Sequence, residues 1–339
     1  MINKTTVSLK NYHTFHLEVT ADSIIHINSE DELKSYFKNK ESDRKWIVLG
    51  GGSNVVFRNH FEGDVLIMNF VGIEILEDSE YNQLIRVNAG TNWHEFVSYC
   101  VEHDLGGVEN LALIPGTVGA SPIQNIGAYG VEVKDVIKQV NAIKLSSLSD
   151  VNYSNSECKF AYRDSIFKNE LKNQVILTSV DFILTKKHLY KLNLSYKPVI
   201  DFLSQLNILE PSIKDVYKAV ISIRKSKLPN PDHIGNSGSF FKNPIIQSEL
   251  FFELKQKYSE MPYYEQSNGE IKLPAGWLIE KAGWKGYRKN DVGVYPKQAL
   301  VLINYGNAEP YEVLALVNEI KKTVNQLFNI DLQTEVNII

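Results

Sequence analysis

Short apolar runs alternate with amphipathic stretches along the first half of the chain. The runs at 46–49, 64–69 and 84–89 have the length of strands, and the first ends in three glycines. A helical pattern follows, and its apolar stripe consists of Phe96, Val97, Cys100 and Val101. Thr91 is placed to cap this helix and Gly106 to end it. The pattern therefore predicts alternating strands and helices in this half.

The middle of the chain, about 136–184, is richer in short strands, and 174–180 is one of them. After Pro211 a helix is predicted to begin at Ser212 or Asp215 and to end before Pro229. Its apolar face consists of Val216, Ala219, Val220 and Ile223. The chain thus changes from short strands to a mixture of helices and strands at about Pro211. We expect a domain boundary before that point, near Lys186-Lys187-His188.

A further helix is predicted near the C-terminus, where Asn307 and Pro310 precede an apolar stripe. The stripe consists of Val313, Leu314, Val317, Ile320, Val324 and Leu327. The segment after this helix, 334–339, has the pattern of a strand. From Pro211 on, the pattern therefore has α+β character.

Composition narrows the functional classes. The 339 residues are 43% hydrophobic and 22% charged, which is typical of a soluble protein with two or three domains. A formal net charge of -4 argues against non-specific binding to nucleic acid. We expect no signal peptide and no membrane span, because no apolar run approaches the required length. Cys100 and Cys158 are expected to be buried and reduced, which fits the cytoplasm. The eight histidines are scattered, so no metal site is expected.

The first segment with candidate chemistry is Gly50-Gly51-Gly52-Ser53-Asn54, directly after a predicted strand. Successive glycines allow positive φ angles and expose backbone N–H groups that can bind a pyrophosphate. Val55 breaks the G-x-G-x-x-G pattern, so a Rossmann turn is unsupported. Taken alone, the segment is better explained as a tight turn after a strand.

The second segment, 114–130, contains four glycines and two prolines among apolar residues. This composition predicts a rigid, irregular loop that can form a wall against a flat ring system, with Gln124 and Asn125 to contact ring heteroatoms. A packed Ω-loop without a ligand explains the pattern as well. The third segment is Tyr162-Arg163-Asp164, where stacking and ion pairing can hold the arginine. A surface salt bridge is its alternative explanation.

These segments are followed by a fourth, Gly238-Ser239-Phe240-Phe241-Lys242-Asn243-Pro244. Taken in this order, from Thr14 to Val336, the set resembles the family of UDP-N-acetylenolpyruvoylglucosamine reductases. His16 stands where the family often has glycine, and Ser237 where alanine is usual.

The resemblance implies two domains of α+β fold. Residues 1–186 would form a FAD-binding domain of the vanillyl-alcohol-oxidase (PCMH) type, with subdomains at about 1–70 and 71–186. Residues 187–339 would bind the substrate, with the last strand, about 330–339, returning to the active site. NADPH is the implied electron source, and a monomer that binds neither nucleic acid nor membrane is expected.

The resemblance also assigns binding residues. For FAD these are Gly50, Gly51, Gly52, Ser53, Asn54, Pro115, Gly116, Thr117, Gly119, Ala120, Ser121, Gln124, Asn125, Gly127, Ala128 and Tyr129. For the UDP-sugar they are Tyr162, Tyr196, Lys227, Asn243 and Gln298. Tyr196 resembles the tyrosine loop of the family's longer, type I members, which closes over the substrate phosphates. Solvated surface is the simpler explanation for Lys227 and Gln298.

The implied reaction reduces UDP-N-acetylglucosamine enolpyruvate to UDP-N-acetylmuramate in peptidoglycan synthesis. A hydride from flavin N5 goes to the terminal carbon, a proton goes to its neighbour, and charge builds up on the carboxylate as an enediolate. By resemblance the active-site residues are Arg163, Ser239 and Glu335. Arg163 suits the carboxylate, and Ser239 suits proton donation. Glu335 suits a hydrogen bond to the enediolate when protonated, or orientation of Arg163 or a water when ionised. Without the resemblance, Ser239 is a turn residue and Glu335 a surface strand residue.

Two other functions remain open. Another PCMH-type flavin oxidoreductase, acting on a small alcohol or hydroxy acid, would share the first two glycine segments but not Gly238-Ser239 or Glu335. A non-catalytic UDP-sugar-binding module would explain the glycines and basic residues, but not the set of Arg163, Ser239 and Glu335.

Overall fold

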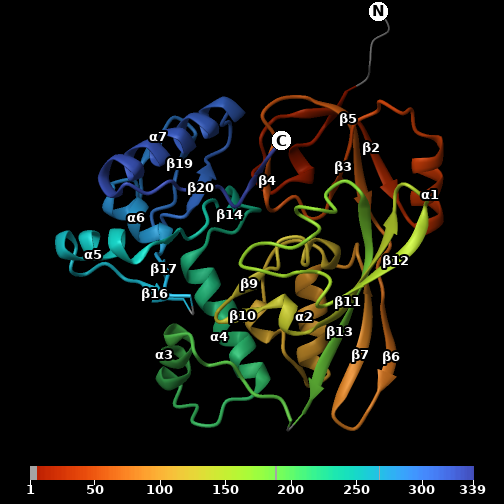
Figure 1. Cartoon of the computed structure of the whole chain (residues 1–339), viewed down its shortest axis with the longest axis horizontal. Coiled ribbons are helices and arrows are strands. Elements are labelled where there is room, and N and C mark those ends of the chain that lie inside the picture. The colour runs from red at the N-terminus through yellow and green to blue at the C-terminus, as the bar shows by residue number, and fades with distance from the viewer. Residues whose placement is uncertain (1–5, 188, 267) are drawn as a thin grey trace, which may run out of the picture. The chain divides into compact units, whose positions relative to one another are not determined.

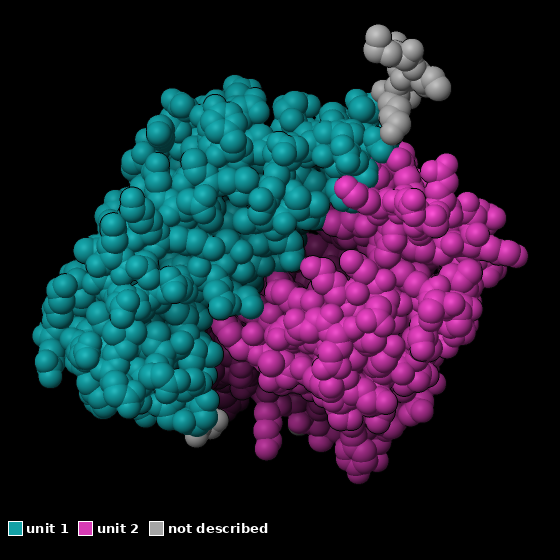
Figure 2. Space-filling view, turned by 45° about the horizontal axis from the view of Figure 1, so that its top comes forward, with its two compact units in different colours: residues 1–22, 52–62, 227–339 teal, residues 23–51, 63–226 magenta. Residues whose placement is uncertain are grey.

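The computed structural model describes residues 6–187, 189–266 and 268–339 (Figure 1). Contacts along the chain group them into two compact units (Figure 2). Unit 1 comprises Met1–Asp22, Gly52–Glu62 and Lys227–Ile339, and unit 2 comprises Ser23–Gly51 and Gly63–Ser226. The division into domains 1–186 and 187–339 stays a prediction, and His188, at its expected boundary, lies outside the described residues.

Two sheets lie mainly in unit 2. The first has the order β1-β2-β5-β3 and the second β12-β11-β13-β7-β6, with β8 also paired to β13. The strands of the first are β1 (Val7–Ser8, in unit 1), β2 (Thr20–Ile27), β3 (Trp46–Leu49) and β5 (Phe61–Met68). Those of the second are β6 (Ile73–Asp78), β7 (Asn82–Asn88), β8 (Leu105–Gly106), β11 (Ile137–Lys144), β12 (Ser149–Ser154) and β13 (Val175–Lys186). The predicted strands at 46–49, 64–69, 84–89 and 174–180 are confirmed, three of them with shifted ends.

The helices that lie mainly in unit 2 are α1 (Glu30–Asn39), α2 (Trp93–Glu102), α3 (Lys197–Gln205) and α4 (Ile213–Lys227, whose last residue belongs to unit 1). Two of them, α1 and α2, connect strands of these sheets. One apolar cluster joins the predicted stripe of α2 to the buried face of α4 and to Val140, Val180 and Phe182 of the second sheet. Cys100 and Cys158 are buried in it as free thiols, and burial raises the pKa of Cys158 to about 12. The predicted burial of both cysteines is confirmed.

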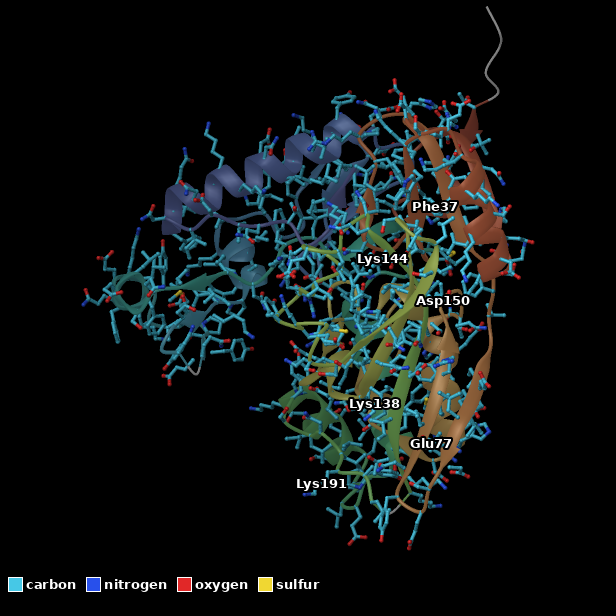
Figure 3. The ribbon with its side chains drawn as sticks, turned by 45° about the vertical axis from the view of Figure 1, so that its right-hand side comes forward. Phe37, Glu77, Lys138, Lys144, Asp150 and Lys191 are labelled. Carbon is cyan, nitrogen blue, oxygen red and sulfur yellow. The ribbon has the colours of Figure 1, made fainter. Side chains whose placement is uncertain are left out.

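A smaller apolar cluster lies between α1 and the sheets. Ile27 and Leu66 of the first sheet meet Ile143 and Ile176 of the second, and Phe37 of α1 packs on them. Lys34 on α1 pairs with Asp150 on β12 at 2.7 Å. Figure 3 labels Phe37 on α1 and Asp150 on the β11–β12 hairpin.

The edge that leads into the first glycine segment is fixed by one buried carboxylate. Parallel pairing of β3 with β5 places Trp46 opposite Asp64. The Asp64 carboxylate accepts hydrogen bonds from Ser23, from the Tyr36 hydroxyl at 2.8 Å and from Arg44 Nε at 2.9 Å. Burial opposes ionisation of Asp64, but these hydrogen bonds outweigh it and lower its pKa. Strand β3, which ends at Leu49, is therefore held firmly just before Gly50.

Unit 1 is built from short antiparallel sheets with helices beside them. The order β14-β20-β19-β18 forms one sheet and β15-β17-β16 another, and β21 pairs with β4 in parallel. The strands are β4 (Val55–Val56), β14 (Gly235–Ser239), β15 (Ile245–Ile246), β16 (Tyr264–Glu265), β17 (Ile271–Lys272), β18 (Arg288–Lys289), β19 (Val292–Val294), β20 (Val301–Asn304) and β21 (Asn337–Ile338). The helices are α5 (Ser248–Lys257), α6 (Ala275–Lys281) and α7 (Pro310–Phe328).

Two helix starts differ from the sequence prediction. Asn92, not Thr91, caps α2, because its side chain accepts from the N–H groups of His94 and Glu95. Glu309, not Asn307, precedes α7 and forms a capping box with Glu312.

The buried face of α7 also differs in part. Leu316 and Phe328 are buried where Leu314 and Leu327 were expected, and Leu327 is exposed. The sequence offers apolar residues on both sides of the stripe, so contacts with the rest of unit 1 decide which side faces inward. Among the described residues, no helix combines the length and the apolar character needed to cross a membrane.

Candidate active site

The first two glycine segments meet in unit 2. A Cβ on Gly50 would lie 2.8 Å from Thr117 Oγ1, and one on Gly51 would lie 2.8 Å from Gly116 Cα. Gly116 has a φ of 131°, in the region that favours glycine. Any side chain at position 51 would have to displace backbone. The structure therefore brings together two segments that the sequence analysis had singled out separately.

The loop 114–130 is held by its own polar side chains. The Asn125 carboxamide donates to Glu132 at 2.9 Å and to the Ala161 carbonyl at 3.0 Å, and it accepts the Lys134 N–H. Ser121 Oγ donates to the Val118 carbonyl. Asn125 and Ser121 are both fully buried, so these two side chains shape the loop. Sequence alone did not indicate that role for the Asn125 side chain.

Arg163 extends from a strained turn onto this loop. Its φ is 55°, and its Nη2 donates to the Gly127 carbonyl at 2.8 Å. The guanidinium lies over the Tyr162 ring, with Cζ 5.5 Å from the centroid. Asp164 accepts from Asn169 at 2.8 Å, and its backbone bridges to Ala161. The third segment therefore contacts the second, and the guanidinium is held in a fixed plane.

Two tyrosines of unit 2 meet edge to face. The rings of Tyr129 and Tyr196 lie 5.0 Å apart, and Tyr196 directly precedes α3. Burial raises the pKa of Tyr129, and the charge of Arg224 opposes that rise. The sequence analysis missed Arg224. Its place one helical turn before Lys227, on the same face of α4, was the available signal.

The third glycine of the first segment belongs to unit 1. Gly52 has a φ of 60°, and a Cβ there would lie 2.5 Å from His13 Cα. His13 is 2% exposed, its Nε2 lies 3.2 Å from the Leu17 carbonyl, and its ring meets Phe57 edge-on. Burial lowers the pKa of His13 to about 4, so the ring is neutral at pH 7.

In unit 1 a backbone hydrogen bond joins the segment that contains Ser239 to the segment that contains Glu335. Ser239 ends β14 next to Gly238, whose φ of 66° turns the chain. The following Phe240 carbonyl accepts the Glu335 N–H at 2.9 Å. Asn54 Nδ2 donates to the Glu335 carbonyl at 3.3 Å. Glu335 lies in a bend rather than in the predicted strand, which is reduced to β21. The sequence pattern could not locate the bend, because it depends on the Phe241–Thr334 bridge.

Two candidate substrate residues meet at the start of α6. Asn243 Oδ1 accepts the Ala275 N–H at 2.9 Å. Gln298 Oε1 accepts the Leu300 N–H and would lie 3.1 Å from a Cβ on Gly276. Helix α6 has seven residues, so its own dipole is small. Lys227, the last residue of α4, is exposed and belongs to unit 1.

Both departures from the family pattern are accommodated within unit 1. His16 has a φ of 54°, which explains why glycine suits this position. Its ring contacts the carbonyls of Lys10 and Pro231, each at 3.1 Å. Ser237 is buried, and its hydroxyl donates to the Val55 carbonyl at 3.2 Å.

The glycine loops of unit 2 fit a dinucleotide. Gly50 and Gly51 leave no room for side chains against 116–120, and Gly116 and Gly130 have positive φ. Loops of this kind can offer backbone N–H groups to a pyrophosphate. In the part of the chain that the structure describes, no group of His, Cys, Asp and Glu residues is arranged to hold a metal ion.

Comparison with known proteins identifies two matching regions. Residues 230–339 match the family model of the UDP-N-acetylenolpyruvoylglucosamine reductase C-terminal domain, and residues 21–146 match that of an FAD binding domain. The UDP-N-acetylenolpyruvoylglucosamine reductase of Flavobacterium johnsoniae is 47% identical over 332 residues, which cover 98% of both chains. That of Amoebophilus asiaticus is 43% identical, again over 98% of both chains.

A solved structure has the same fold. The crystal structure of UDP-N-acetylenolpyruvylglucosamine reductase from Thermus caldophilus matches with a TM-score of 0.69 at 22% identity, over 98% of both chains.

We predict that Gly51→Ala abolishes cofactor retention. The added methyl group would meet the Gly116 backbone, so the two glycine segments must separate. Purified protein should lose its flavin absorbance, while circular dichroism should still show a folded chain. Gly276→Ala is the matched control, because its Cβ would meet only the side chains of Gln298 and Leu300. Equal flavin content in the two variants would contradict the prediction.

We predict that His13 makes the protein sensitive to acid. Its pKa is about 4 in the folded chain and 6.5 when unfolded, so protonation favours unfolding as the pH falls below 6.5. The full effect corresponds to roughly 3 kcal/mol, reached near pH 4. His13→Gln keeps a donor for the Leu17 carbonyl but does not titrate. Denaturant unfolding at about pH 7 and pH 4.5 should show a smaller loss for His13→Gln. Parallel losses in both proteins would rule out this role.

Proposed function

The chain belongs to the UDP-N-acetylenolpyruvoylglucosamine reductase family, and from that premise we propose that it reduces UDP-N-acetylglucosamine enolpyruvate to UDP-N-acetylmuramate, using NADPH and bound FAD. The product is a precursor of peptidoglycan. Sequence identity of 47% to a UDP-N-acetylenolpyruvoylglucosamine reductase, over 98% of both chains, carries the proposal. The backbone hydrogen bond from Glu335 to Phe240, the residue after Ser239, agrees with it.

Bound FAD supplies a hydride carrier between NADPH and the substrate. We propose that residues Gly50 to Asn54 and Pro115 to Tyr129 hold it. Backbone N–H groups suit the diphosphate, because they need no counter-charge and are fixed by the surrounding loops. The buried carboxamide of Asn125 contributes by shaping the loop.

Arg163 binds the carboxylate of the enolpyruvyl group in this proposal. A guanidinium held by the Gly127 carbonyl and the Tyr162 ring offers paired donors in a fixed plane. Charge that develops on the carboxylate during reduction is then stabilised without reorganisation of the site.

Ser239 donates the proton to the carbon next to the carboxylate. A hydroxyl is a weak acid, but an enediolate is a strong enough base to take its proton. The buried rings of Phe240 and Phe241 directly follow Ser239 and limit access of water. Glu335 is carried by the segment whose N–H binds the Phe240 carbonyl, so its position depends on the Ser239 strand. From there it hydrogen-bonds the enediolate or orients a water.

The UDP-sugar contacts are assigned to Tyr162, Tyr196, Lys227, Asn243 and Gln298. The ring of Tyr196 packs edge to face against Tyr129. Tyr129 lies in the loop 114–130, which we propose to bind the cofactor and call the cofactor loop, so Tyr196 is placed to bind a phosphate beside the flavin. Lys227 adds a point charge for phosphate. NADPH and UDP-sugars are metabolites of the cytoplasm, so we place the protein there. We expect it to act as a monomer.

An absorbance spectrum and an oxidation assay test the proposed function. Purified protein should be yellow, and NADPH should bleach the flavin bands under anaerobic conditions. Steady NADPH oxidation should require the enolpyruvyl UDP-sugar. A colourless protein that cannot be reconstituted with FAD would end the proposal. Fast reoxidation of reduced flavin by oxygen would instead favour an oxidase.

We predict that Ser239→Ala separates the two half-reactions. NADPH should still reduce the flavin at the wild-type rate, while reduction of the UDP-sugar should slow about 10²–10⁴-fold, the usual contribution of a general acid. Ser237→Ala is the matched control, because it removes a hydroxyl two residues away that bonds only the Val55 carbonyl. Stopped-flow absorbance resolves both steps. Loss of flavin reduction in Ser239→Ala would refute the role of proton donor.

A further inference from the structure

The start of α2 contacts the segment 111–117, which leads into the cofactor loop. The Trp93 N–H donates to the Gly116 carbonyl at 3.0 Å, and the Trp93 indole donates to the Leu111 carbonyl at 2.9 Å. Asn92, the cap of α2, forms a backbone bridge with Thr117. Three contacts therefore fix the chain on both sides of Ile114–Pro115.

His94 supplies a fourth contact, and it differs from the others because its strength depends on protonation. The Leu113 N–H donates to His94 Nδ1 at 3.1 Å. Leu113 has a φ of 59°, a left-handed conformation that is unfavourable for a bulky residue. Such a conformation persists only where surrounding contacts impose it. Here it aims the chain into Ile114, the first residue of the cofactor loop.

The hydrogen bond defines the state of the imidazole. Nδ1 must carry a lone pair to accept the N–H, so the ring is neutral with its proton on Nε2. The ring stacks on Tyr217 of α4 at 5.8 Å and 17°, and the Tyr217 hydroxyl bonds Ser98 at 2.8 Å. Burial lowers the pKa of His94, and so do Lys225 and Arg224 on α4. Glu95, its neighbour on α2, opposes them.

We propose that His94 is a positioning residue for FAD, and that the protein releases FAD in acid because protonated His94 no longer holds Leu113. This rests on the cofactor role proposed above for residues 114–130. An imidazolium carries hydrogen on both nitrogens, so Nδ1 would face the Leu113 N–H donor to donor. Leu113 would then relax from its left-handed conformation, and the approach of Gly116 to Gly51 would be lost.

The direction of the pH dependence follows from the sign of the pKa shift. The neutral ring predominates above the ordinary pKa of histidine, so FAD is held fully at pH 7 and above. Affinity falls as the pH drops through the lowered pKa of His94.

Two substitutions separate the acceptor from the ring. His94→Asn keeps an acceptor at the position of Nδ1, because its Oδ1 is the same number of bonds from Cβ, but it does not titrate. His94→Phe keeps a ring to stack on Tyr217 but has no acceptor. Tyr217→Phe is the control, because it removes the hydroxyl that bonds Ser98 and keeps the stack.

The experiment measures the dissociation constant of FAD by fluorescence titration of full-length apoprotein between about pH 5 and pH 8. Wild-type affinity should fall by about tenfold toward pH 5, the usual effect of one lost hydrogen bond. His94→Asn should bind as the wild type does at pH 8 and show a flatter profile. His94→Phe should bind about tenfold more weakly at pH 8, also with a flatter profile.

Two outcomes would overturn the inference. One is a wild-type profile in His94→Phe, and the other is a pH dependence in His94→Asn as steep as in the wild type. If His94→Phe does not fold, the profile of His94→Asn still decides the question. Failure of the wild type to bind FAD at any pH would instead contradict the proposed function.

Discussion

A side chain at Gly51 would meet the backbone of Gly116, whose own φ of 131° favours glycine, and the organisation of unit 2 depends on that contact. Strand β3 must end at a fixed place for Gly51 to reach it, and the Asp64 network fixes that strand. The loop after Leu113 must arrive from the other side, and α2 directs it there. A contact between two glycines contributes little energy itself. The contact forms, however, only if strand β3 and helix α2 are both correctly positioned.

The loop 114–130 also contacts two residues of unit 2 that we propose to be functional, Arg163 and Tyr196. Gly127 binds Arg163 through its carbonyl, and Tyr129 supports the ring of Tyr196. Asn125 joins the loop to Glu132 and Ala161. The loop proposed to contact the cofactor therefore also holds the arginine proposed to bind the carboxylate. Unit 1 uses a comparable arrangement, in which the Phe240 carbonyl links the strand of Ser239 to the segment of Glu335.

Sequence alone predicted much of this, for identifiable reasons. Glycines and apolar periodicity are local signals, so segments 50–54 and 114–130 and the helices at α2, α4 and α7 could be recognised. Features that depend on distant partners could not. The carboxamide of Asn125 was expected to contact a ring, but it has partners at Ala161 and Lys134. Glu335 lies in a bend because Thr334 bridges to Phe241. Arg224 belongs to no motif, and beyond its spacing from Lys227 it is its neighbour Tyr129 that marks it as part of the candidate site.

The chain order of the two units has a consequence for biosynthesis. Unit 2 is complete once residue 226 has been made, whereas unit 1 needs Met1–Asp22 and Lys227–Ile339 together. The Thr14 hydroxyl bonds the Asn236 carbonyl, and Asn304 bonds the Phe15 carbonyl. The Thr14 hydroxyl and the Phe15 carbonyl therefore find these partners only after residues 236 and 304 have been synthesised. A nascent chain would complete unit 2 before unit 1, and until then the contacts of Thr14 and Phe15 with Asn236 and Asn304 would be missing, which leaves this part of unit 1 incompletely packed and open to chaperones and proteases.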